Sequence, residues 1–213
     1  MDNFLSTIVV IALTINCILY FKSFFNNEKA FKIFSFYLAM CLFTEFMLRV
    51  LIYYKYQNLI MTHFYFIMQF LLLSYFYHEL LNNKLKKRLI RYYAVFMIVV
   101  LIFRFVLFPE FLMQFDLFEI FFTCFPIIIY AILYFYQMLE SKKKFYLVNI
   151  GLTIYLFGST IIFLTGNIIN IYSPKFARSC WRFNSLLCIF YHVMVFIEWK
   201  KNYSKIRANE SNL

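Results

Sequence analysis

The chain has very few residues that break or bend a helix. Only three glycines and three prolines occur in 213 residues, and all three glycines, Gly151, Gly158 and Gly166, fall within one apolar stretch. One proline, Pro126, lies inside an apolar stretch, where it removes a backbone N–H and frees the carbonyl of Phe122. The sequence therefore predicts long helices with one kink, and it disfavours mechanisms that need many bending helices. The three glycines predict that their helix packs closely against a neighbour.

Charged residues are also scarce, at 15% of the chain against 64% hydrophobic residues. A soluble domain of this length could not bury so much apolar surface, because the core grows slowly with chain length. Lipid cannot satisfy open backbone N–H and C=O groups, so every apolar stretch of about 20 residues must cross as a helix. We therefore predict an all-α polytopic membrane protein with seven transmembrane helices, at 4–21, 33–54, 60–81, 89–108, 117–138, 147–171 and 179–199.

The patterns of metal and covalent sites are missing. The three histidines are scattered, with no HxxxH motif, and no CxxC or Cys/His spacing suggests zinc. No nucleophile–base pair or acidic dyad occurs at a useful spacing. No two of the five cysteines fall in outer loops, so no disulfide is predicted. We expect no enzyme activity, no metal and no cofactor, and the histidine-rich membrane hydrolases of the adiponectin-receptor and ceramidase group are disfavoured.

Basic residues are twice as frequent as acidic ones, 21 against 10, and they are unevenly distributed. Fifteen of them follow the first, third, fifth and seventh spans: Lys22, Lys29, Lys32, Lys84, Lys86, Lys87, Arg88, Arg91, Lys142, Lys143, Lys144, Lys200, Lys201, Lys205 and Arg207. Positive loops stay in the cytoplasm. The pattern predicts a multi-pass protein of the cytoplasmic membrane, with the N-terminus outside and the C-terminus inside. The basic loops are expected to contact anionic lipid of the bilayer and no nucleic acid.

A weak internal repeat relates the two ends of the chain. Shifting residues 2–88 by 114 positions onto 116–202 gives 19 identities, where this composition gives about 8 by chance. Repeat 1 therefore covers 1–88, a connector helix covers 89–108 and repeat 2 covers 116–202, with a short basic tail at 203–213. One helix between two triplets restores the chain direction, so the triplets would be parallel repeats within a single membrane domain, 1–213.

This plan of three helices, one connector and three helices resembles the small carriers of the SWEET and PQ-loop families. It is also similar to the plan proposed for microbial rhodopsins and to many uncharacterised seven-helix bacterial membrane proteins. The family motifs are absent. No Pro-Gln pair occurs, the repeat partner of Pro126 is Ala12, and no lysine in 179–199 could hold retinal. The resemblance therefore implies an architecture and no ligand.

Polar side chains within the spans gather on the predicted outer side of the midplane. Such groups are costly in lipid, so each needs a bonding partner or a function. The candidates for an outward-facing ligand site are Glu45, Arg49, His63, Gln69, Arg104, Glu119, Asn167, Arg182 and Asn184. The inner half is nearly free of polar groups, which predicts a pocket that opens outward above an apolar floor.

The charged candidates allow several interpretations. Glu45 and Arg49 are four residues apart, so they share a helix face and either neutralise each other or contribute to a site. Arg49, Arg104 and Arg182 together would suit a carboxylate or phosphate. Alternatively, Arg104 and Arg182 extend to outer headgroups.

The histidines also remain open. His63 is either a pH-responsive ligand contact or a donor to a neighbouring carbonyl or carboxylate. His78 and His192 are repeat partners. They form either a paired inner gate or two interfacial anchors.

Two functions fit these features. The first is a small receptor or sensor that binds an anionic or zwitterionic solute, or a lipid headgroup, from outside. Because no output domain is expected, it would signal through a cytoplasmic protein. The alternative is a small-solute transporter with the same helix plan, which would need a polar route through both halves of the bundle.

Overall fold

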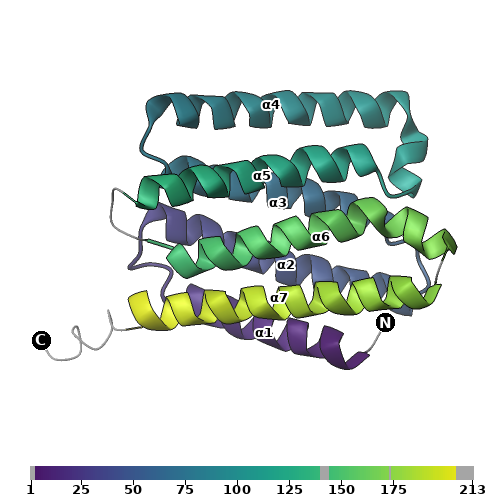
Figure 1. Cartoon of the computed structure of the whole chain (residues 1–213), viewed down its shortest axis with the longest axis horizontal. Helices are drawn as coiled ribbons and strands as arrows, with labels where there is room; N and C mark the ends of the chain where they lie inside the picture. The colour runs from purple at the N-terminus through teal and green to yellow at the C-terminus, as the bar shows by residue number, and fades with distance from the viewer. Residues whose placement is uncertain (1–2, 140–143, 173, 205–213) are drawn as a thin grey trace, which may run out of the picture.

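The computed structural model describes residues 3–139, 144–172 and 174–204, without the side chains of residues 3 and 166–175. Seven long helices fill these ranges (Figure 1): α1 Asn3–Lys22, α2 Lys29–Tyr53, α3 Leu59–Leu80, α4 Lys84–Leu107, α5 Leu117–Met138, α6 Tyr146–Tyr172 and α7 Pro174–Asn202, with a short 3-10 helix η1 at Pro109–Met113. All seven long helices are apolar enough to cross a membrane. The all-helical fold with seven candidate spans is confirmed. The orientation in the membrane stays a prediction.

Side chains cap the first turns of two helices. The Asn83 side chain accepts hydrogen bonds from the N–H groups of Leu85 and Lys86, at 2.8 and 3.4 Å, and so starts α4. Asp116 accepts from the N–H of Phe118 at 3.0 Å and starts α5 in the same way. These side chains satisfy backbone donors that have no partner within their helix.

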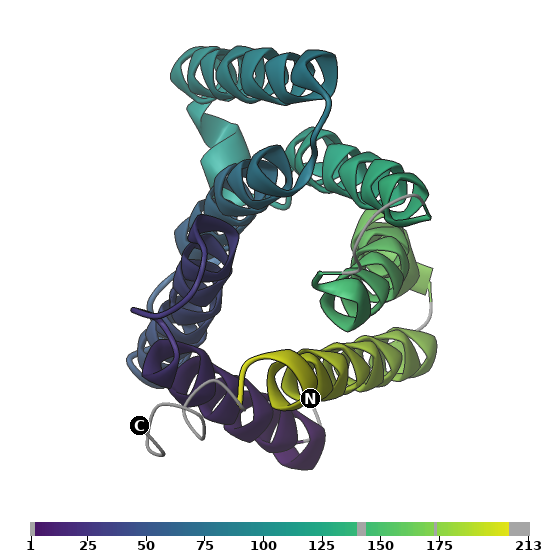
Figure 2. The same cartoon turned by 90° about the vertical axis from the view of Figure 1, so that its left-hand side faces the viewer.

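Six of the helices form a closed ring, and α4 lies outside it. The neighbours around the ring are α1, α2, α3, α5, α6 and α7, and α7 returns to α1, as seen along the bundle in Figure 2. We call the end of the bundle where α1 begins the N-terminal end, and the end where α7 stops the C-terminal end. The connection through η1 lies at the N-terminal end.

The neighbour relations have the order that two related triplets would give. Under the repeat, α1 corresponds to α5 and α7 corresponds to α3. In the ring α1 contacts α7, and the corresponding helices α5 and α3 also contact each other. Phe31 and Phe145, repeat partners under the 114-residue shift, are both buried and contact each other, with ring centroids 6.4 Å apart. A residue touches its own repeat partner only near the axis that relates the two halves. The internal repeat itself stays a prediction, which superposition of the triplets would test.

The outer helix α4 is tied to the ring through the proline of α5. Pro126 cannot donate to the carbonyl of Phe122, and the Tyr93 hydroxyl of α4 donates to that carbonyl instead, at 3.0 Å. A neighbouring helix thus satisfies the group that the proline frees. Otherwise α4 packs mainly on α3 through Ile90, Met97 and Leu101.

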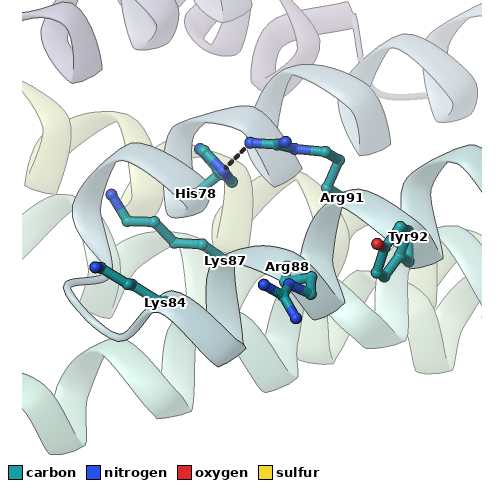
Figure 3. Close-up of a pocket in the computed structure, with 6 residues that line it drawn as sticks. All are labelled: His78, Lys84, Lys87, Arg88, Arg91 and Tyr92. Carbon is teal, nitrogen blue, oxygen red and sulfur yellow. Dashed lines mark hydrogen bonds between the residues drawn. The ribbon is translucent and has the colours of Figure 1, made fainter.

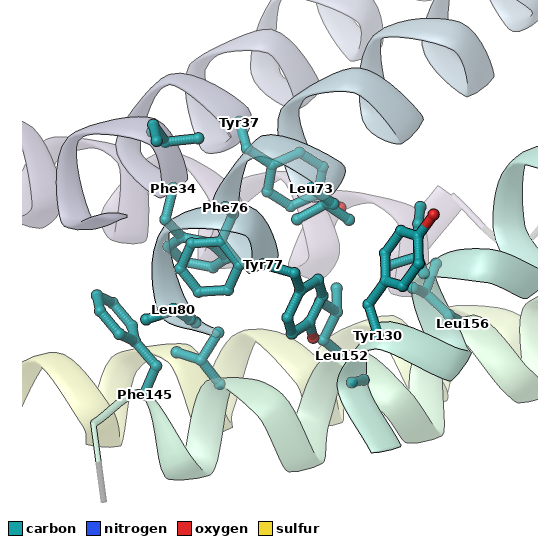
Figure 4. Close-up of a cluster of buried hydrophobic side chains, with 14 of the residues drawn as sticks. Phe34, Tyr37, Leu73, Phe76, Tyr77, Leu80, Tyr130, Phe145, Leu152 and Leu156 are labelled. Carbon is teal, nitrogen blue, oxygen red and sulfur yellow. The ribbon is translucent and has the colours of Figure 1, made fainter. Parts of the chain in front are cut away.

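The C-terminal half of the ring is filled by aromatic and aliphatic side chains (Figure 4). Phe34, Phe76 and Phe145 are almost fully buried, and Phe76 lies 5.2–5.3 Å from the other two rings by centroid. The Tyr77 hydroxyl donates to Asn149 Oδ1 at 2.6 Å, and Asn149 Nδ2 donates to the carbonyl of Ala131 at 3.1 Å. The buried polar groups here join α3, α6 and α5, so this half is a structural core.

Two glycines of α6 allow close approach of α7, as the sequence predicted. A Cβ added at Gly151 would lie 2.9 Å from Cβ of Met194 and 3.3 Å from Cα of Tyr191. A Cβ at Gly158 would collide with the Leu187 side chain. The close packing of α6 on α7 therefore depends on the missing side chains.

Candidate functional site

A cavity of about 330 Å³ lies inside the ring and runs from the N-terminal end to just past the middle of the bundle. Four of its walls are helices α1, α2, α3 and α7, and α6 completes them. It is lined by Ser6, Val9, Leu13, Tyr37, Cys41, Thr44, Glu45, Leu48, Thr62, Tyr65, Phe66, Phe115, Tyr155, Phe163, Trp181, Asn184, Ser185, Cys188, Tyr191 and His192. Its volume falls within the range of small-molecule sites, and its walls are mostly apolar and aromatic.

The mouth of the cavity carries an ion pair. Arg49 Nε donates to Glu45 Oε1 at 2.9 Å, which confirms the pair predicted from their spacing, and Arg49 Nη2 donates to Ser6 Oγ at 2.7 Å. Both charged side chains are part-exposed, at 46% for Arg49 and 31% for Glu45. The guanidinium thereby joins α2 to α1, and Glu45 is the one formally charged residue among the described lining residues.

Two polar groups of the lining lack a partner within the described part of the protein. The Tyr191 hydroxyl and Asn184 Oδ1 are buried and accept or donate no hydrogen bond there. Tyr191 stacks on Tyr155, with ring centroids 5.6 Å apart, and both line the cavity. Buried polar atoms without partners are costly, so these two are the best-placed groups to bond a ligand.

The bottom of the cavity is closed by packing and by a bonded histidine. His192 lines the cavity, and Asn16 of α1 donates from Nδ2 to its backbone carbonyl at 2.9 Å. Tyr37, at the same depth, lines the cavity and also belongs to the aromatic core of the C-terminal half. Gln69 lies just beside this floor, where its Oε1 accepts from the Tyr65 hydroxyl at 2.6 Å and its amide faces Sγ of Cys124.

His63 and Glu119 form a buried pair between α3 and α5, outside the cavity lining. His63 Nδ1 makes a short contact with Glu119 Oε2, and side-chain exposure is 6% and 1%. Of the two interpretations of His63, the structure shows the bond to a carboxylate. His63 Nε2 and Glu119 Oε1 have no other partner among the described residues. This pair therefore fixes the α3–α5 interface.

The three arginines do not converge on one site. Arg104 forms a two-pronged bond to Asp116, at 2.5 Å from Nε to Oδ2 and 3.0 Å from Nη2 to Oδ1, and its guanidinium lies 3.9 Å from the ring centroid of Phe111. Arg49 is held by Glu45, and Arg182 lies on the exposed surface of α7, outside the lining. The expected anion site of three arginines is thus not formed, because the three side chains lie in separate places and contact different groups. Asn167 lies outside the described side chains.

The two histidines predicted as an inner gate do not face each other. His78 Nε2 accepts from Arg91 of α4 at 3.3 Å, on the outside of the ring, whereas His192 faces α1 and the cavity. Helix α3 ends two residues after His78, whereas α7 continues ten residues beyond His192. Helix α3 does not contact α7, so equivalent sequence positions do not become a pair.

Sequence reasoning missed the uncharged part of the site. Cys41, Tyr155, Trp181 and Cys188 line the cavity, but they look like ordinary membrane residues. Helical periodicity could have found the α7 face, because its lining residues 181, 184, 185, 188, 191 and 192 recur every three or four positions. Sequence reasoning also missed Asp116. Its place directly before an apolar run is the signature of a helix cap.

Metal and disulfide chemistry find no support in the described residues. No three of their His, Cys, Asp and Glu side chains gather closely enough to hold a metal ion. All five cysteines are free.

Comparison with known proteins gives no relative. No protein-family model, no curated protein and no solved structure matches the chain. The argument for function therefore depends on the cavity alone.

Proposed function

We propose that the protein is a small membrane receptor that binds a neutral, largely apolar molecule with one or two hydrogen-bonding groups in the ring cavity. The observation that carries this proposal is the buried, unpartnered Tyr191 hydroxyl in the wall of a mostly apolar and aromatic cavity. Asn184 Oδ1 offers a second bond to the same ligand. Specific sites combine such walls with a few placed polar groups.

Charge argues for a neutral ligand rather than the anion expected from the sequence. The described lining holds one formal charge, Glu45, and Arg49 neutralises it at the mouth. Arg104 is already paired with Asp116, and neither residue lines the cavity. A buried anion would meet a carboxylate and no unpaired cation in this lining, so its desolvation would be uncompensated.

The packed C-terminal half favours a receptor over a transporter. Below the cavity, Phe34, Phe76 and Phe145 fill the ring, and the interhelical bonds of Asn149 hold the surrounding helices. A ligand that tightens α7 against α1 and α6 would act on the C-terminal end through α7. There Tyr203 packs against Phe31 and Phe145, at 4.6 and 5.5 Å between centroids. A cytoplasmic protein would then recognise this basic end, in the predicted orientation.

The alternative function is a small-solute transporter. The ring order favours it in one respect, since the helix contacts between the two triplets are concentrated at the α1–α7 and α3–α5 interfaces, along which they could rock. Transport would still require that the cavity open at the C-terminal end.

Thiol labelling from each face of the membrane tests the proposal. A variant that keeps only Cys188, with Cys17, Cys41, Cys124 and Cys180 changed to alanine, places one thiol in the cavity wall. A matched variant keeps only Cys180, near the N-terminal end of the bundle. Each is treated, in sealed vesicles of known orientation, with a cationic or an anionic membrane-impermeant methanethiosulfonate reagent.

We expect Cys188 to react only from the face that also exposes Cys180. The anionic reagent should gain no advantage at Cys188 relative to Cys180, whereas an anion site would accelerate it there. Equal reaction of Cys188 from both faces would support the transporter instead. If Cys188 reacts with neither charged reagent from either face, nor with a small neutral methanethiosulfonate that modifies Cys180, no solute reaches the cavity and the proposed site is refuted.

A further inference from the structure

Four basic residues occupy one face of the first two turns of α4. Lys84, Lys87, Arg88 and Arg91 follow the spacing i, i+3, i+4 and i+7, which places them on the same side of a helix. With His78 of α3 and Tyr92 they line a second cavity, of about 640 Å³, at the C-terminal end of the bundle (Figure 3). This cavity lies outside the ring and is separate from the proposed ligand site.

The positive charge of this cavity is not balanced by the described residues. No carboxylate is among those that line it. The nearby Glu79 is bonded to Lys29 at 3.1 Å and lies 3.4 Å from His78 Nδ1, so it faces none of the four cations of α4. Arg91 donates to His78, and the other three cations have no ion-pair partner in the described part of the chain. Like charges at these spacings repel each other. Cations in the first turn also oppose the helix dipole, so the arrangement favours a bound anion.

The same face of α4 continues as an apolar surface. Val95, Val99, Ile102 and Val106 follow Arg91 at steps of three and four residues, and all are exposed, at 47–71%. Tyr92 lies at the boundary, in Figure 3 beyond the four cations along the helix. One helix face therefore begins with four cations and ends with branched aliphatic side chains, and the phenol between them is typical of the lipid–water interface.

We propose that the corner between α3 and α4 binds an anionic phospholipid. Its phosphate would lie in the cavity of Lys84, Lys87, Arg88 and Arg91, and an acyl chain would follow the apolar face of α4. Basic pockets between transmembrane helices recognise anionic headgroups, and arginine forks suit phosphate oxygens. Because α4 touches the ring only through α3, α5 and η1, a lipid bound here would fasten this outer helix to α3.

The test is the thermal unfolding midpoint of the purified full chain in neutral detergent. We compare added phosphatidylglycerol with phosphatidylcholine of the same acyl chains. Phosphatidylglycerol should raise the midpoint by about 5 °C or more at roughly a hundredfold excess over its Kd, and phosphatidylcholine should not. The variant Lys84→Gln/Lys87→Gln/Arg88→Gln/Arg91→Gln should lose this shift, yet be no less stable without lipid, since it relieves like-charge repulsion.

The matched control removes four positive charges at the same end of the bundle but outside the cavity: Lys22→Gln/Lys86→Gln/Lys200→Gln/Lys201→Gln. It should keep the phosphatidylglycerol shift. Equal loss in both variants would overturn the proposal in favour of general surface charge. An equal shift with inorganic phosphate would overturn the lipid as the source of the phosphate. Should the quadruple variant fail to fold, Arg88→Gln/Arg91→Lys must show a reduced shift, and an unchanged shift there would also refute the site.

Discussion

The aromatic core and the cavity wall differ in how their buried polar side chains are bonded. In the C-terminal half, the hydroxyls of Tyr20 and Tyr77 and the Asn149 side chain each bond a group on another part of the chain. In the cavity wall, the Tyr191 hydroxyl and Asn184 Oδ1 have no hydrogen-bond partner in the described residues. Outside the cavity lining, Asn16 Oδ1 and Ser74 Oγ also lack one. Polar groups are costly in a membrane protein. The bonded groups are therefore explained by helix packing, whereas the two unpartnered groups that line the cavity are placed to bond a ligand.

The largest expected difference between the halves concerns aromatic packing. Phe76→Ala removes a fully buried ring from the C-terminal core and should lower the free energy of unfolding by about 3–5 kcal/mol. Phe163→Ala removes a part-buried ring from the cavity wall and should cost about 1 kcal/mol, because that ring already borders open space. Unfolding in detergent, followed by circular dichroism, measures both values. Equal costs would contradict the contrast.

The buried pair His63–Glu119 in the N-terminal half lies outside the cavity lining, and its two side chains bond each other. His63→Leu leaves the Glu119 carboxyl buried without its partner and should cost about 3 kcal/mol. The double variant His63→Leu/Glu119→Leu should recover most of that loss, since it removes the unpaired group as well. If the two variants are equally unstable by the same unfolding assay, the pair does not hold the α3–α5 interface as described.

The contact of α6 with α7 offers a smaller test in the C-terminal half. Gly151→Leu inserts a side chain where even a Cβ would lie 2.9 Å from Met194, and it should cost about 1–3 kcal/mol. Ile154→Leu, on the exposed side of the same helix, is the control and should leave the unfolding midpoint unchanged. A tolerated leucine at 151 would show that the two helices are not tightly packed.

The smallest expected effect is at the outer helix. Tyr93→Phe removes the donor to the carbonyl of Phe122 and should cost about 0.5–1.5 kcal/mol. In a Pro126→Ala background the restored N–H of residue 126 can satisfy that carbonyl, so the same change should cost less. A double-mutant cycle in detergent measures the difference, and strict additivity would remove the role assigned to Tyr93.

The seven-helix fold could be predicted from the sequence because each helix depends on the length and composition of its own apolar run. Each of the seven apolar runs was long enough to cross a bilayer, and the helices differ from the predicted spans by a few residues at their ends. The pair Glu45–Arg49 was found for the same reason, since four residues on a helix fix a direction. Close packing at Gly151 and Gly158 was likewise visible in the residue type.

The site was less predictable because it depends on which helices become neighbours. His63 and Glu119 are 56 residues apart, and nothing local indicates that α3 and α5 meet. The ion pair of Arg104 could not be predicted from the spans, because its partner, Asp116, lies just outside the apolar run 117–138. Charged residues stand out in an apolar sequence, whereas the cavity wall consists largely of tyrosines, cysteines and a tryptophan. Which of these side chains point inward depends on how the helices are arranged in the ring.

The position of α4 has a consequence for how the chain could be divided. The ring closes without α4, which returns the chain from the C-terminal end to the N-terminal end so that α5 can start there. Two separately translated fragments, cut within 108–116, should therefore assemble and copurify. In such a split protein, α4 would remain attached to the first fragment, outside the ring, and the cavity would be formed by two polypeptides.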